Sequence, residues 1–310
     1  MFWIAFSNVI SMLVYMIPGF LVCKLKKVSV EHQPSLSGIL LSVCAPSLIL
    51  SSFLSMDYNT SDFVKMGLFF VIIVLLQGIF LGILMLLVRK KIDDKRFRVF
   101  PICSTFCNVG FFGLPIIKAL LPESPIAVCF ASTFSVTLNF FVYSIGAFCV
   151  TNDKKYMSLK AAIINPQVIS FFFAVPMYVL GVRNYLPDFI LKAINLLGSM
   201  TTPLCMIILG IRLASVEFKK LFTRPLVYLA LFTKLLAFPI FCYLCVKWLP
   251  SSLFNDTFKI TVLVLTGTPT ASGTLSIAEL YKGETEIPAN CVLLSTLASC
   301  ITIPILTLLV

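Results

Sequence analysis

Residues 99–121, VFPICSTFCNVGFFGLPIIKALL, are long and apolar enough to cross a membrane, yet they cannot form one continuous helix. At ~1.5 Å rise per residue, the stretch covers a hydrocarbon core of ~30 Å. Its centre holds Asn108, Gly110, Gly113 and Pro115. Pro115 has no amide hydrogen and its ring clashes with the preceding turn, while the glycines weaken the helix around it. We therefore expect a break near Gly113, and freed backbone groups at this depth indicate a solute-binding site.

The composition is that of an all-α membrane protein. Apolar residues make up 59% of the 310 residues and charged residues only 12%, against roughly a quarter charged in soluble domains. Most of the apolar segments reach the ~17–25 residues that a membrane span needs. These ten segments are residues 2–23, 35–54, 63–88, 99–121, 126–150, 161–181, 191–211, 225–247, 258–281 and 288–310. We predict ten transmembrane helices, with the fourth and the ninth broken.

The placement of Lys and Arg predicts the orientation, because basic residues are retained on the cytoplasmic side. If the N-terminus is outside, the inner loops hold 17 of the 24 basic residues. The 17 are Lys24, Lys26, Lys27, Arg89, Lys90, Lys91, Lys95, Arg96, Arg98, Lys154, Lys155, Lys160, Arg212, Lys219, Lys220, Arg224 and Lys282. Both termini then lie outside. The net charge of +11 reflects this topology and contact with anionic membrane lipid, and it calls for no nucleic acid partner.

The eleven cysteines are scattered through apolar segments and do not form a disulfide framework. Cys103 and Cys107 are one helical turn apart, and Cys242 and Cys245 form a CxxC pair, but such buried pairs are usually small hydrophobic residues. His32 is the one histidine, so little else can complete a zinc or haem site. The GxSxG, HExxH and phosphate-loop motifs are missing. We predict no catalytic residues, no metal and no cofactor, and hence no enzyme.

The chain reads as two halves. Four features of the first half recur in order in the second, 157 to 162 residues later, which indicates an internal repeat. They are VIS at 9–11 and at 168–170, Ala45-Pro46 and Thr202-Pro203, Gly113 and Gly273, and Ala127-x-Cys129 and Ala289-x-Cys291. Because each half has an odd number of spans, the second half enters the membrane from the opposite side, which is a transporter architecture. The cut lies in the polar loop 151–160, giving repeats at 1–150 and 151–310.

The two broken helices are predicted to cross near the membrane midplane. Their second halves begin near Leu114 and Thr274, and the positive ends of these half-helices point at the crossing, where an anionic group is the natural ligand. Thr266 adds a further hydrogen-bonding group there. The candidate site residues are Asn108, Gly110, Gly113, Pro115, Thr268, Pro269, Ser272, Gly273 and Thr274.

At these residues the chain resembles the auxin efflux carrier family, which includes plant auxin exporters and bacterial carriers of malonate or other carboxylates. One motif is STFCNVGFFGLPIIKALL at 104–121, with its Asn, Gly-x-Pro and Lys-Ala at the family's spacing. The other is TPTASGTLSIAELY at 268–281, with its Pro and Ala-Glu-x-Tyr. Segment number, termini and length fit as well, so the resemblance covers the whole chain.

The resemblance implies a ten-helix inverted-repeat fold related to bile acid sodium symporters, in which a transport domain moves like an elevator against a scaffold. It also implies that Asn108 helps to bind a substrate carboxylate, and it suggests a homodimer formed through the scaffold. Plant exporters have a proline where this chain has Gly273-Thr274, and many have a long loop where this chain has 151–160. The bacterial-type branch of the family is the better match. This favours a carrier in the inner (plasma) membrane of a bacterium over a plant exporter of auxin.

Several polar residues have a simpler interpretation beside the functional one. Asn108 can join two helices by a hydrogen bond. Glu279 and Lys234 are candidates for coupling, since an intramembrane charge is costly. However, Glu279 can lie at the cytoplasmic mouth, and Lys234 can reach an interface or a neighbouring carbonyl. Lys118 reads as a snorkelling lysine and Asn139 as a weak candidate ligand.

The sequence therefore predicts a secondary active transporter that exports or exchanges small organic carboxylates, such as auxin-like or malonate-like anions, by elevator-type alternating access. The proton gradient is the expected driving force. The alternatives are a sodium-coupled organic anion symporter, for which Glu279 is the clearest acidic ligand, and a membrane sensor or channel that does not transport. A channel should show a polar stripe along a pore, whereas the polar residues here concentrate at two breaks.

Overall fold

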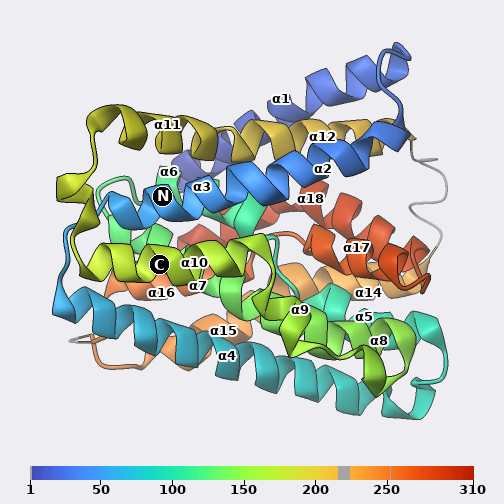
Figure 1. The fold of residues 1–310 in the computed structure, drawn as a ribbon. Coiled ribbons are helices and arrows are strands. Elements are labelled where there is room, and N and C mark those ends of the chain that lie inside the picture. The colour runs from blue at the N-terminus through green and yellow to red at the C-terminus, as the bar shows by residue number, and fades with distance from the viewer. Residues whose placement is uncertain (1, 216–223, 252) are drawn as a thin grey trace.

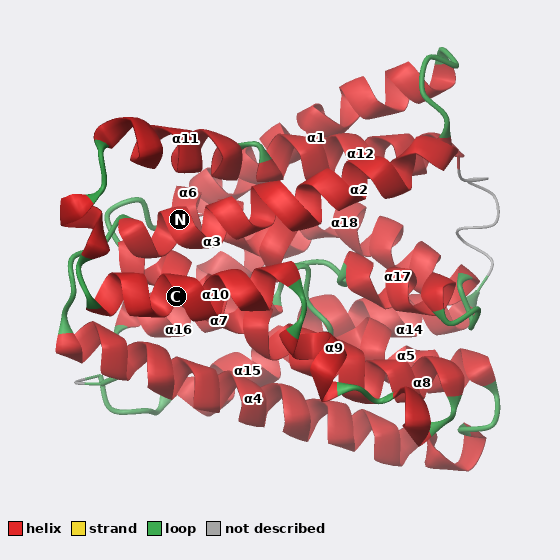
Figure 2. Cartoon of the chain, in the orientation of Figure 1, coloured by secondary structure: helices red, strands yellow, loops and turns green. Residues whose placement is uncertain are grey.

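The structure, a computed structural model, describes residues 2–215, 224–251 and 253–310, in which helices are joined by loops and no strand is drawn (Figure 2). Within these residues, eight helical segments are long and apolar enough to cross a membrane. They are Phe2–Lys24, Val30–Leu54, Thr60–Lys91, Pro125–Thr151, Lys154–Val179, Asp188–Ala214, Pro225–Lys247 and Glu286–Leu309. The predicted fourth and ninth segments are the two that are not among the eight.

These two segments are interrupted, as the sequence predicts. In the fourth segment α5 (Lys95–Thr105) ends, three residues are not helical, and the chain resumes as a π-helical turn, Val109–Gly113, that leads into α6 (Leu114–Leu120). In the ninth segment α16 (Asp256–Thr266) is separated from α17 (Ser272–Leu280) by residues 267–271. We call residues 106–108 and 267–271 together the junction.

The positions of the breaks differ from the prediction. The first break spans residues 106–108 instead of lying near Gly113, and the second half-helix of the ninth segment begins at Ser272, two residues before Thr274. Pro115 follows the π turn in the first turn of α6, a position at which proline is tolerated. Gly113 serves close packing, since a Cβ there would lie 2.8 Å from Cδ2 of Leu265.

We divide the helices into two groups, a four-segment group made of the first, second, sixth and seventh predicted segments and a six-segment group made of the others (Figure 1). In the four-segment group, α1 packs most extensively against α12, and α3 packs against α10 and α11. Helix α1 also packs against α6 and α18 of the six-segment group. In the six-segment group, α4 packs against α5 and α7, α15 against α16, and α18 against α5 and α14. The bounds are α1 (Phe2–Lys24), α2 (Gln33–Ile39), α3 (Ala45–Leu54), α9 (Leu159–Ile163), α10 (Pro166–Val179), α11 (Asp188–Ser199) and α12 (Thr201–Ser215) in the first group, and α4 (Thr60–Val88), α7 (Pro125–Phe141), α8 (Ala147–Thr151), α14 (Pro225–Phe232), α15 (Phe238–Lys247) and α18 (Glu286–Leu306), with α5, α6, α16 and α17, in the second.

Two glycines allow the closest helix contact of the four-segment group, between α1 and α12. A Cβ added to Gly210 would lie 2.0 Å from the carbonyl oxygen of Met16, and one added to Gly19 would lie 2.1 Å from that of Ile207. Both clashes are with backbone atoms, which cannot rotate away. Glycine is therefore required at both positions if the two helices are to stay this close.

The loops predicted to be cytoplasmic gather at one end of the molecule, on the right in Figure 1. Three ion pairs connect these loops and the adjacent helix ends: Lys95 with Glu284 (3.8 Å), Arg224 with Glu286 (2.9 Å) and Arg212 with Glu279 (2.8 Å). We call this the charged end. At the other end, the Tyr178 hydroxyl accepts from the amide of Asn59, and Arg183 donates to the carbonyl of Ser55. Lys219 and Lys220 of the predicted inner set lie outside the described residues.

Candidate substrate-binding site at the junction

The two interruptions meet and hydrogen bond to each other. The amide of Asn108 donates to the carbonyl of Pro269 (2.8 Å), and the amide of Ala271 donates to the carbonyl of Phe106 (2.9 Å). Between them Cys107 and Thr270 form an isolated antiparallel β-bridge. Backbone groups within a membrane must be satisfied by protein or water. The two breaks therefore stabilise each other.

The helix ends that stop at the junction are capped differently. At the end of α5, the Thr270 hydroxyl donates to the carbonyl of Cys103 (2.9 Å), and the Thr270 amide donates to the Ser295 hydroxyl of α18 (2.9 Å). At the end of α16, the ammonium of Lys234 donates to the carbonyl of Thr266 (2.6 Å). A neutral hydroxyl thus caps one helix end and a cationic group the other.

The backbone of Asn108 is fixed by hydrogen bonds, whereas its side-chain amide nitrogen has no partner among the described residues. Its carbonyl accepts from the amides of Phe112 and Gly113, both at 3.0 Å, which closes the π turn. The side chain is only 3% exposed, and its Nδ2 has no hydrogen-bond partner among the described residues. An unsatisfied buried donor costs about 1–3 kcal/mol. A bound acceptor would remove this cost, so Asn108 has the environment of a ligand-binding residue.

A polar cluster lies beside Gly110, one residue into the π turn. A Cβ on Gly110 would lie 3.4 Å from Nε2 of Gln167 and 3.6 Å from Oγ of Ser135. The Ser135 hydroxyl is buried and, within the part of the chain that is described, has no partner. Asn139 donates to Oε1 of Gln167 (3.3 Å) and to the carbonyl of Ser135 (2.8 Å). Ser135 and Asn139 belong to α7 and Gln167 to α10, so the cluster bridges the two groups of helices.

The sequence prediction missed Ser135 and Gln167 and gave Asn139 little weight. The spacing of Ser135 and Asn139 by four residues places them on one face of α7, which was an available signal. Gln167 carries no such signal. It stands in the first turn of α10, where Asn165 caps the helix by accepting from its amide, and its place beside Gly110 follows from tertiary packing.

The other predicted site residues take several positions around the junction. The hydroxyls of Thr268 and Thr274 are buried and donate to the carbonyls of Leu265 (2.7 Å) and Ala271 (2.5 Å). Gly273 faces open space, since a Cβ there would have no neighbour within 4 Å. The carbonyl of Pro269 pairs with Asn108, and Pro115 stands in the first turn of α6. Ser272 is partly exposed at the start of α17.

The two coupling candidates lie in different surroundings. The Glu279 side chain is 54% exposed at the charged end, where it pairs with Arg212. Lys234 is fully buried and lies at the junction, with its ammonium on the carbonyl of Thr266. The interpretation of Lys234 as a lysine that reaches a neighbouring carbonyl is thus the one that the structure matches.

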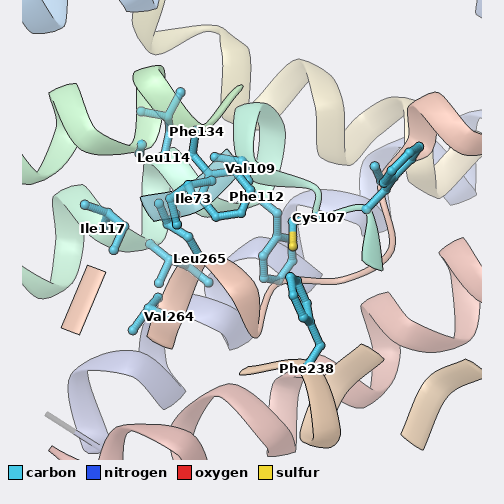
Figure 3. Close-up of a cluster of buried hydrophobic side chains, with 14 of the residues drawn as sticks. Ile73, Cys107, Val109, Phe112, Leu114, Ile117, Phe134, Phe238, Val264 and Leu265 are labelled. Carbon is cyan, nitrogen blue, oxygen red and sulfur yellow. The ribbon is translucent and has the colours of Figure 1, made fainter. Parts of the chain in front are cut away.

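Apolar side chains surround the junction. Figure 3 shows Cys107 beside Phe238, with Val109, Phe112, Leu114, Phe134 and Leu265 nearby. The thiol of Cys107 is in no disulfide and lies within hydrogen-bonding distance of two carbonyls, that of Thr105 at 3.4 Å and that of Thr266 at 3.6 Å. Among the described residues, no three His, Cys, Asp or Glu side chains gather in a way that could hold a metal ion. A shallow surface depression of about 420 Å³ has Tyr143, Lys160 and Asn165 among its lining residues.

The sequence profile of the family described as membrane transport protein matches residues 4–159 and again residues 151–307. The chain belongs to this family. The match confirms, at the level of the family, the resemblance to the auxin efflux carriers, and it makes the protein a membrane transporter and not an enzyme. The two matched stretches agree with a duplicated chain.

The chain is also similar to a curated transporter of the same kind. It is 27% identical over 290 residues to the uncharacterized transporter MJ1031 of Methanocaldococcus jannaschii. The matched region covers 88% of each chain. This relative carries no named substrate. The substrate of the present membrane transport protein is therefore inferred from the site.

Proposed function

We propose that the protein is a secondary active transporter for small organic carboxylates, which it exports or exchanges through a binding site at the junction. The observation that carries this proposal is the unpartnered Nδ2 of Asn108, a buried neutral donor beside two meeting helix breaks. A substrate carboxylate oxygen would accept its hydrogen bond. The hydroxyl of Ser135, also without a described partner, supplies a second contact nearby.

The ends of the half-helices favour an anion at this place. The helical residues that begin at Val109 and Ser272 both start at the junction, so the positive ends of two helix dipoles face it. The open space at Gly273 leaves room for a ligand beside the first turn of α17. In transporters with discontinuous helices, half-helix N-termini often point at anionic substrate groups in this way.

The two groups of helices support alternating access by displacement of one group against the other. The polar cluster joins α7 of the six-segment group to α10 of the four-segment group. The pair of Arg212 with Glu279 joins α12 to α17 across the same boundary at the charged end.

The finer features complete the proposal. The fold comprises ten crossings in two inverted repeats, both termini lie outside, the charged end faces the cytoplasm of a bacterium, and the four-segment group is the scaffold and the surface of a homodimer. Proton coupling drives transport, and sodium coupling is the alternative. The loop that contains Asp94 tests the orientation, since a cysteine at this position should react only with reagents that reach the cytoplasmic side.

The test is uptake of labelled malonate and a panel of monocarboxylates into proteoliposomes, with and without an imposed proton gradient. We expect saturable uptake that responds to the gradient and is lost in Asn108→Ala. Asn290→Ala is the control, because it removes another buried amide with an unpartnered Nδ2, near the start of α18. Equal uptake by Asn108→Ala and wild type would contradict the site. No uptake under a proton or sodium gradient would contradict carboxylate transport.

A further inference from the structure

Lys234 is a buried cation placed at the negative end of a helix. It lies in the π-helical turn Thr233–Ala237 between α14 and α15, and its side chain is fully buried. Its ammonium donates to the carbonyl of Thr266 over 2.6 Å and lies 5.5 Å from the centre of the Phe238 ring. Thr266 is the last residue of α16, so its carbonyl belongs to the end of the helix that carries partial negative charge.

This position is one at which discontinuous-helix transporters hold a coupling ion. Unwound backbone carbonyls and the C-terminal ends of half-helices are the groups that coordinate Na⁺ in such proteins. Here an ammonium already lies on such a carbonyl. Like a sodium ion, an ammonium is a compact single positive charge, but it is attached to the chain through a four-carbon stem.

Of the two helix ends that stop at the junction, only the end of α16 has a cationic cap. The end of α5 is capped by the neutral hydroxyl of Thr270. The repeated features are 157 to 162 residues apart, so the residue that corresponds to Lys234 lies within 72–77 of α4, and every residue of that stretch is neutral. The two halves of the chain thus differ in charge at matching positions, which points to a specific use of the lysine in the second half.

We propose that the Lys234 ammonium is a built-in cation that occupies the ion position at the junction, so that substrate binding and transport need no sodium or other metal cation. This inference rests on the proposed function and decides between its two coupling alternatives. It also places a positive charge beside Cys107, the residue before Asn108, because the Cys107 thiol and the Lys234 ammonium both approach the Thr266 carbonyl. An anionic substrate at Asn108 is favoured by this charge without touching it.

The first test is thermal unfolding of the purified full chain in choline chloride, lithium chloride, sodium chloride and potassium chloride at equal ionic strength. The wild type should unfold at the same temperature in all four salts. Lys234→Ser removes the ammonium and leaves space with a hydroxyl and the Thr266 carbonyl. We expect its unfolding temperature to fall by several degrees in choline chloride and to rise again with a small alkali cation.

Matched variants make the result specific. Lys259→Ser removes a lysine whose ammonium donates to the Lys247 carbonyl at an exposed position, and it should show no cation dependence. Lys234→Met keeps the length of the side chain and removes the charge, so it should be less stable than wild type even if Lys234→Ser fails to fold. A wild type stabilised specifically by sodium would overturn the proposal. So would a Lys234→Met variant as stable as wild type.

These measurements need no transport activity, so they separate two kinds of failure. If the salt responses are as expected and no carboxylate is transported, the cation position stands and the substrate class is wrong. If uptake depends on Asn108 and the wild type requires sodium, the substrate site stands and the built-in cation is wrong.

Discussion

The amide of Asn108 donates a 2.8 Å hydrogen bond to the carbonyl of Pro269, 161 positions later in the sequence, and so joins the two interrupted helices. The bond fixes the backbone of Asn108 and leaves its side chain free. The residue that carries the unpartnered side-chain amide is therefore held in place by the second half of the chain. Any variant that loosens the junction should weaken binding at Asn108 as well.

Thr270→Val tests the cap on α5. The variant loses the hydrogen bond from the Thr270 hydroxyl to the Cys103 carbonyl. It keeps the shape of the side chain and the hydrogen bond from the backbone amide to the Ser295 hydroxyl. We expect a loss of about 1 kcal/mol in the free energy of unfolding, measured by thermal or denaturant unfolding. Thr302→Val is the control, since the buried hydroxyl of Thr302 has no partner in the described chain and its removal should be neutral or stabilising. Equal effects of the two variants would contradict the role of Thr270.

Gly210→Ala tests the contact between α1 and α12. The new methyl group would lie 2.0 Å from the Met16 carbonyl, so the helices must move apart. Overpacking of this kind typically costs about 1–3 kcal/mol, and we expect a lower unfolding temperature. Gly82→Ala is the control, because nothing lies within 4 Å of its Cβ on α4 and alanine favours a helix by up to about 1 kcal/mol. An unchanged Gly210→Ala protein would show that the close contact is not required.

Glu279→Gln tests the ion pair across the boundary of the two groups. An exposed pair contributes only about 0–1 kcal/mol to stability, so the unfolding temperature should change little. The displacement of one group against the other must separate Arg212 from Glu279, and the variant should therefore exchange substrate faster in counterflow experiments. Glu286→Gln removes an ion pair within the six-segment group and should leave the exchange rate as it is. A rate that is unchanged in Glu279→Gln would place the boundary elsewhere.

The acid sensitivity of the charged end follows from Asp94. Hydrogen bonds from the side chain and amide of Arg96 lower the pKa of Asp94 from 3.8 to about 2. A lowered pKa stabilises the folded state fully above the ordinary value, and this contribution is lost as the pH falls from about 4 to about 2. The unfolding temperatures of wild type and Asp94→Asn should differ at pH 6 and converge near pH 2. A difference that is constant over this range would contradict the assignment.

Much of the architecture is readable from local residue chemistry. Apolar length identifies the eight long helices, and glycine, proline and Asn108 within the fourth segment identify an interruption, because these rules act over a few neighbouring residues. Asn108 was predicted as a site residue on this basis, and the structure adds that its side-chain Nδ2 is buried and has no partner among the described residues.

The position of the first break could not be predicted in this way. It depends on contacts between distant segments: Gly113 packs against Leu265, and the strand-like pairing of Cys107 with Thr270 ends α5 early. The same is true of Gln167, which reaches Gly110 only because α10 packs against α7. Lys234 was visible as a costly charge, but its partner, the Thr266 carbonyl, is set by the interruption of another helix.

The most direct test of the account is equilibrium binding of labelled malonate and the monocarboxylate panel to the purified protein, comparing wild type with Asn108→Asp. The variant has nearly the same shape but replaces the amide donor with a negative charge, which repels a carboxylate. The account predicts saturable binding of at least one acid to wild type and its loss in Asn108→Asp, with both proteins shown to be folded by a cooperative unfolding transition. Equal affinity of the two proteins for every acid that binds would contradict a carboxylate site at the junction.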